Sequence, residues 1–168
     1  RKAWEVDVRV VVADPPFQPE DDLDCKGDGL KPDAKTYELR VKKLRSQVNS
    51  ALITLLNVVE RLRPRVLLGE GQGGVVAGMS VFPVVLERAC RDRAVTQQQM
   101  QTFRQAWSGV TAVMIADPVI QPTSNVNKHL PFEMLHDAFP NMSWEQPITK
   151  RTAMYVTQRY MTPPFADS

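Results

Sequence analysis

Residues 66–74 read Val-Leu-Leu-Gly-Glu-Gly-Gln-Gly-Gly, an apolar run that ends in a glycine-rich turn. The apolar, amphipathic stretch Val75–Cys90 follows at once. This order predicts a strand, a tight turn and a helix, the arrangement in which α/β proteins place their chemistry. The turn contains no serine, cysteine, lysine or histidine. It therefore predicts a fold more clearly than it predicts a reaction.

The segments around this turn continue the alternation of strands and helices. Val6–Ala13 is rich in β-branched residues and predicts a strand. Apolar residues recur at three- and four-residue steps through Lys35–Arg63, which predicts a long helix ended by Pro64. The other expected elements are a short, buried strand at Val66–Leu68, a helix from Gly73 that Pro83 divides, its continuation at Val84–Arg93, a helix at Gln97–Trp107 with Thr96 as N-cap, a strand at Thr111–Ala116 and a helix at Leu130–Phe139.

This order of elements predicts an α/β fold, with three αβα layers and a small, mostly parallel sheet. We expect at least three parallel strands, ordered around Val66–Leu68. Residues 18–34 have the composition of a mobile acidic loop, and residues 140–168 read as an irregular C-terminal segment with one extended or helical piece around Arg151–Tyr160. The 168 residues suit a single domain. The chain begins without methionine, and we expect it to be a fragment of a longer protein.

Composition excludes several classes of protein. The net charge of +2 supplies no global field that would draw the chain onto nucleic acid or a membrane. No apolar run reaches the roughly 18 residues that span a bilayer. The only cysteines, Cys25 and Cys90, provide no disulfide framework, so an intracellular setting is expected and Cys90 is predicted to be an inert core thiol.

The glycines of the turn have two interpretations that need no family resemblance. In the first, they only permit a positive φ angle and close packing of a helix on a strand. In the second, Gly69, Gly71 and Gly74 form the G-x-G-x-x-G pattern of a Rossmann-like dinucleotide-binding loop. That loop needs an acidic residue about 20 residues further on, whereas the next predicted strand ends only at Asp117. Glu70 would also repel a pyrophosphate.

The turn also resembles the nucleophile elbow of the α/β-hydrolase family. Residues 69–74, Gly-Glu-Gly-Gln-Gly-Gly, are similar to the Gly-x-Ser-x-Gly of its esterases, lipases and thioesterases, often written Gly-His-Ser-Gln-Gly-Gly. The resemblance covers about residues 4–120 and includes the helices before and after the turn. Gly71 stands in the place of the nucleophile, and glycine can adopt the strained turn but cannot attack a substrate. The resemblance thus implies a hydrolase-like scaffold without hydrolase chemistry.

A second resemblance lies near the start of the chain. Asp14-Pro15-Pro16-Phe17 resembles the Asp-Pro-Pro-aromatic motif of amino-group methyltransferases. In that family the acidic residue and its carbonyl hold the target amine, and the aromatic ring stacks beside it. The resemblance implies that residues 69–74 form an S-adenosylmethionine loop in a permuted order.

Charged clusters outside the turn are expected to be solvated. Asp22, Asp24, Gly27 and Asp33 fall at EF-hand spacings, but Lys26 stands where a third ligand belongs, so no metal site is predicted. His129 and His136 are read as surface or satisfied histidines. A basic cluster near the start of the long helix could contact an acidic partner or phosphates, but a solvated helix face is the favoured interpretation. Its members are Arg40, Lys42, Lys43 and Arg45.

The leading interpretation is a catalytically inactive, hydrolase-like binding or assembly module within a larger protein. It implies a protein partner or a neighbouring domain, no membrane and no catalytic residue. The alternatives are a methyltransferase-like domain and, behind it, a dinucleotide-binding domain. No cofactor is identified by these residues. The predicted pocket edge consists of Gly69, Glu70, Gly71, Gln72, Gly73 and Gly74, with Asp14 and Asp117 at the ends of neighbouring strands.

Overall fold

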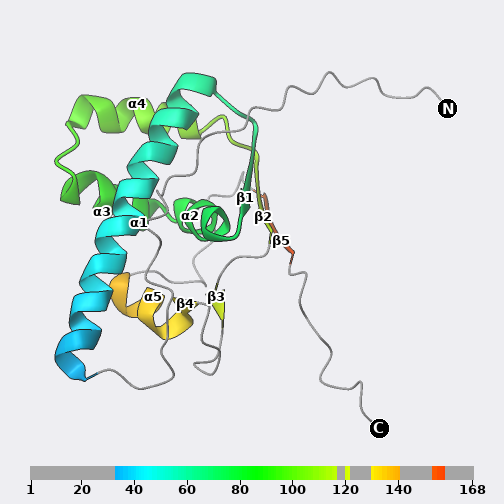
Figure 1. The fold of residues 1–168 in the computed structure, drawn as a ribbon. Helices are drawn as coiled ribbons and strands as arrows, with labels where there is room; N and C mark the ends of the chain where they lie inside the picture. The colour runs from blue at the N-terminus through cyan, green and yellow to red at the C-terminus, as the bar shows by residue number, and fades with distance from the viewer. Residues whose placement is uncertain (1–32, 117–119, 122–129, 141–152, 158–168) are drawn as a thin grey trace, which may run out of the picture.

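Helices and parallel strands alternate along the chain in the computed structural model, which describes residues 33–116, 120–121, 130–140 and 153–157 (Figure 1). The described part is a small α/β fold. The predicted strand Val6–Ala13 and most of the acidic loop lie outside it. The helices are α1 (Ala34–Leu62), α2 (Gln72–Ser80), α3 (Pro83–Asp92), α4 (Gln97–Trp107) and α5 (Phe132–Ala138), and the strands are β1 (Val66–Glu70), β2 (Ala112–Ala116), β3 (Ile120–Gln121), β4 (Leu130–Pro131) and β5 (Ala153–Thr157).

The long helix α1 begins and ends at local signals in the sequence. Asp33 is its N-cap, with Oδ1 accepting from the Thr36 backbone N–H at 2.9 Å and Oδ2 accepting from the Thr36 hydroxyl at 2.7 Å. These hydrogen bonds, the hydroxyl's first, lower the pKa of Asp33. The helix stops at Arg63, which has φ 49° and ψ 49° in front of Pro64. Asp33 is therefore a helix cap and not part of a mobile loop.

The main sheet is parallel throughout its described part. β1 pairs with β2, with Gly69 opposite Ile115, and β2 pairs with β5, with Met114 opposite Tyr155. The strand order is β1-β2-β5, so β2 is central and β1 lies at an edge of the described sheet. The expectation that the strands are ordered around Val66–Leu68 stays a prediction, because it includes the strand at Val6–Ala13, which lies outside the described residues. Of the piece around Arg151–Tyr160, which was expected to be extended or helical, the described residues 153–157 form the strand β5.

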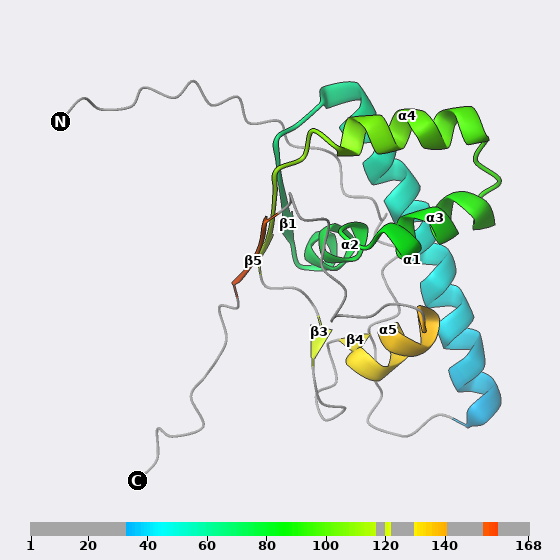
Figure 2. The ribbon, with the colours of Figure 1, turned by 180° about the vertical axis from the view of Figure 1, so that it is seen from behind.

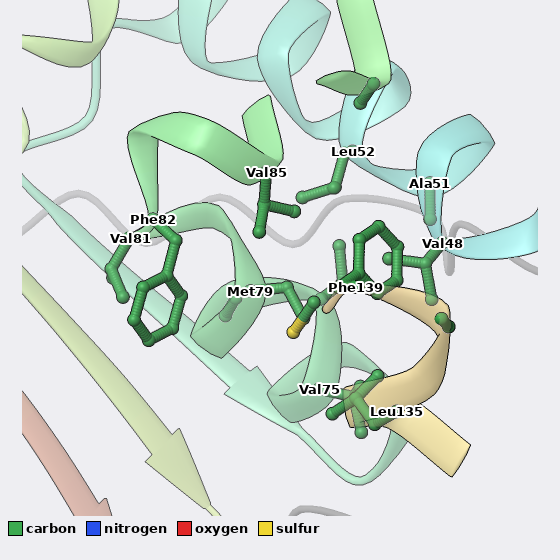
Figure 3. Packing of buried hydrophobic residues seen from close by; sticks show 14 of the residues in the cluster. Val48, Ala51, Leu52, Val75, Met79, Val81, Phe82, Val85, Leu135 and Phe139 are labelled. Carbon is green, nitrogen blue, oxygen red and sulfur yellow. The ribbon is translucent and has the colours of Figure 1, made fainter. Parts of the chain in front are cut away.

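The described helices cover one face of this sheet. In Figure 1, and from behind in Figure 2, α1–α5 all lie on the same side of β1, β2 and β5. The core is built on that side, where Phe139 lies beside Val48 of α1 and Met79 of α2, and Leu135 lies beside Val75 (Figure 3). The opposite face carries exposed apolar side chains, with Val66 51%, Leu68 70% and Met114 42% accessible. The prediction that the Val66–Leu68 strand is buried is therefore wrong in the described part of the chain, because no described helix covers its second face.

Two of the predicted helices differ in their boundaries for different reasons: a proline divides one, and pairing of its first residues as a strand shortens the other. Pro83 begins α3 after Phe82, and the axes of α2 and α3 differ by 103°, which confirms the predicted division. The helix predicted at Leu130–Phe139 begins later, at Phe132, because residues 130–131 pair with β3 as the short strand β4. Within the described residues no single helix has the length and apolar character to cross a membrane, although the bent α2–α3 pair meets those criteria when counted together.

Candidate functional site

Gly71 gives the turn between β1 and α2 its shape. Its φ of 56° and ψ of −121° correspond to the first central position of a type II′ turn, a conformation dominated by glycine. Its N–H donates to the Ala116 carbonyl at 3.1 Å, which ties the turn to the end of β2. Its own carbonyl accepts from the N–H groups of Gly74 and Val75 and so starts α2. The predicted tight strand-to-helix turn is confirmed.

Two other glycines allow α2 to approach the sheet closely. A Cβ added at Gly69 would lie 2.3 Å from the Gly73 carbonyl oxygen and 2.7 Å from the Ala77 Cβ. A Cβ added at Gly74 would lie 3.2 Å from Cγ2 of Ile115. Distances below 3 Å between such atoms force the backbone to move. Close packing therefore explains Gly69 fully and Gly74 in part.

Gly71 and Gly73 differ from these two because they face open space. An added Cβ would meet no heavy atom within 4 Å at either position. Of the two, only Gly71 has a positive φ angle. A side chain at position 71 would therefore project freely from the turn, and the constraint at this position comes from the backbone alone.

The remaining predicted site residues divide between the described and the undescribed parts of the chain. Glu70 is exposed at the end of β1, opposite Ala116, and Gln72 is partly buried at the first position of α2. Asp14 and Asp117 lie outside the described residues, so their approach to the turn stays a prediction. Within the described residues no group of three or more His, Cys, Asp or Glu side chains could hold a metal ion.

The basic cluster on α1 does not act as one surface. Arg45 Nε donates to the Ala138 carbonyl at 2.8 Å, and its Nη2 lies 3.4 Å from the Asp137 carbonyl oxygen. These contacts cap the C-terminal end of α5, where the helix dipole favours a cation. Lys42 and Lys43 are exposed and match the solvated-face interpretation.

The described histidine is exposed, whereas the cysteine on α3 is buried. His136 is exposed on α5, with Nδ1 3.7 Å from Asp137 Oδ1, and His129 lies outside the described residues. Cys90 is buried, which confirms the prediction that it lies in the core, and burial raises the pKa of its thiol. What the sequence reasoning missed is that Cys90 also lines a cavity formed with α1 and α4. No motif marks it, because its walls come from separate helices. The available signal was the spacing of Met100, Phe103 and Trp107, which places them on one face of α4.

Replacing Gly71 by alanine should destabilise the domain by about 1–2 kcal/mol, the usual cost of a positive φ angle for a residue with a Cβ. Since an added Cβ meets no neighbour, this cost is conformational and not steric. Urea denaturation followed by circular dichroism measures it. An unchanged or raised free energy of unfolding would show that the turn relaxes easily.

The chain was compared with profiles of protein families, with curated protein sequences and with solved structures, and none of the three comparisons found a match.

Proposed function

We propose that this domain is a catalytically inactive, hydrolase-like binding or assembly module of a larger protein. The observation that carries the proposal is the backbone of Gly71. It lies between a parallel strand and a helix with φ 56° and ψ −121°, and a side chain there would enter open space. This is the arrangement by which a nucleophile elbow presents its reactive side chain. Glycine provides the backbone and leaves out the hydroxyl or thiol that would react.

The spacing of the neighbouring glycines supports the elbow over a dinucleotide loop. Gly69 and Gly73 stand two residues before and after Gly71, and a Cβ at the first would collide with the carbonyl of the second. A phosphate-binding loop instead needs free backbone N–H groups. Here the N–H of Gly71 is bonded to Ala116, and those of Gly74 and Val75 are bonded to Gly71. The exposed carboxylate of Glu70 adds a repulsion that a pyrophosphate would have to overcome.

The uncovered sheet face supports the assembly part of the proposal. Val66, Leu68 and Met114 present exposed apolar side chains from neighbouring strands. Parallel sheets are normally covered on both faces. We infer that in the full protein a partner or neighbouring domain covers this face, which would complete the three-layer αβα arrangement. The paucity of cysteine fits an intracellular location, which is part of the same proposal.

The methyltransferase-like and dinucleotide-binding alternatives predict a ligand that the inactive module does not. If the proposal is right, neither S-adenosylmethionine nor NAD changes the melting temperature of the 168-residue chain. A ligand at 100 times its dissociation constant should instead add about 2.7 kcal/mol to the free energy of unfolding. Thermal denaturation at increasing ligand concentration makes the measurement, with a known methyltransferase and a known dehydrogenase as positive controls.

If a ligand does raise the melting temperature, two variants show which of the alternatives is responsible. A rise with S-adenosylmethionine that Asp14→Asn abolishes would establish the methyltransferase alternative. A rise with NAD that Gly71→Ala abolishes would establish the dinucleotide alternative. Either result overturns the proposal of an inactive module.

A further inference from the structure

A cavity of about 310 Å³ lies between α1, the bend that joins α2 to α3, α3 itself and α4. It is at the opposite end of α2 from the glycine turn, because Ser80 and Val81 line it whereas Gly71 caps the other end of that helix. The cavity therefore belongs to a different part of the fold from the turn. An inference drawn from it does not depend on whether the turn is catalytic.

The walls of the cavity are mainly apolar and partly aromatic. Leu86 and Cys90 contribute from α3, and Met100, Phe103 and Trp107 contribute from α4. Phe103 and Cys90 are almost fully buried, whereas Leu86, Met100 and Trp107 are partly buried. Methionine adapts its shape to irregular ligands, and aromatic side chains offer flat surfaces against which a ring can pack.

The polar side chains in the walls already have partners within the protein. The Ser80 hydroxyl donates to the Ala77 carbonyl at 2.6 Å, and the Ser108 hydroxyl donates to the Gln105 carbonyl at 2.7 Å. Arg104 Nη2 and Glu87 Oε1 form an ion pair at 2.7 Å. The two charges of the wall therefore neutralise each other. A ligand has no charge to match there.

The ion pair also shows where the cavity meets solvent. The Arg104 and Glu87 side chains are 64% and 48% exposed, although both line the cavity. The opening therefore lies beside these two residues, between α3 and α4. A ligand can enter there without crossing the sheet or the core on α1.

We propose that this cavity binds a small, neutral, apolar molecule of about the size of a fused two-ring aromatic. Its volume is roughly twice that of the engineered cavity of about 150 Å³ that takes up benzene. It lies at the lower end of the range of roughly 300–1,000 Å³ for ligand pockets, which are apolar with few polar groups. A charged analogue would lose its hydration and meet an ion pair that is already satisfied, so its binding is weaker.

Naphthol and naphthoate test this proposal because they share a ring system and differ in charge at neutral pH. The Cys25→Ser variant of the 168-residue chain leaves Cys90 as its only thiol, in the cavity wall. We expect naphthol to bind saturably and to slow the modification of Cys90 by a thiol reagent by about tenfold or more at saturation. We expect naphthoate to bind at least about tenfold more weakly, which corresponds to about 1.4 kcal/mol.

Filling the cavity with a tryptophan side chain tests whether naphthol binds inside it. Leu86→Trp introduces bulk from α3 and should abolish the binding of naphthol, whereas Leu39→Trp, at an exposed position of α1, should leave it unchanged. If Leu86→Trp does not fold, Met100→Trp fills the cavity from α4 and decides the matter. The proposal is overturned if naphthol shows no saturable binding, if naphthoate binds equally well, or if binding survives in the folded cavity-filling variant.

Discussion

Replacing Gly69 by alanine should destabilise the domain by about 3 kcal/mol or more, at the upper end of the range for overpacking. The new methyl group would lie 2.3 Å from the carbonyl oxygen of Gly73 and 2.7 Å from the Cβ of Ala77. Because the first of these is a backbone atom, no side-chain rotation can relieve the contact. Helix α2 would have to move away from β1. Urea denaturation gives the change as a fall in the midpoint at constant slope.

Gly73→Ala is the matched control for this variant. The same methyl group added four residues later meets no heavy atom within 4 Å. Gly73 lies inside α2 without a positive φ angle, so alanine should stabilise the domain by up to about 1 kcal/mol. Equal effects of the two substitutions would show that α2 does not pack on β1 as closely as described.

Replacing Leu52 by alanine should cost about 2–5 kcal/mol, the range for a buried leucine truncated to alanine. Leu52 is fully buried on α1 and belongs to the cluster that joins this helix to α2, α3 and the α5 region (Figure 3). The loss combines the transfer of the removed atoms with the cavity that remains. Equilibrium unfolding in urea measures it against the parent chain.

Leu68→Ala, the same change of leucine to alanine, tests whether the second face of the sheet is exposed. Leu68 is 70% exposed in β1. If that face is free for a partner, the substitution should change the free energy of unfolding by no more than about 0.5 kcal/mol, as for other surface positions. A loss comparable with that of Leu52→Ala would mean that another part of this chain already covers the face, which contradicts the assembly proposal.

Local signals in the sequence predicted the boundaries of most elements. Thr96 caps α4, its Oγ1 accepting from the Gln99 N–H at 3.2 Å, as its position before an amphipathic stretch indicated. Pro83 separates α2 from α3, and the burial of Cys90 follows the apolar periodicity of α3. Such signals act over a few residues, so they can be recognised without knowledge of the tertiary fold.

The failures concern contacts between segments far apart in the chain. Whether a strand is covered on one face or on both depends on which segments pack against the sheet, and Val66–Leu68 looks the same in both cases. The strand β5 was predicted only as an extended or helical piece, because the choice between the two depends on its pairing with β2, which joins residues 112–116 to residues 153–157. The cavity beside Cys90 was missed because residues of four separate helices line it.

The glycine turn separates these two kinds of information most clearly. The sequence by itself determined that residues 69–74 form a tight strand-to-helix turn without a nucleophile, since glycine spacing and the missing reactive side chains are local properties. Only the tertiary structure decided what each glycine does. Gly69 is required because α2 packs against its Cα, whereas Gly71 is required by its own backbone angles. The distinction depends on the distance between helix and strand, which is set by the packing of the whole core.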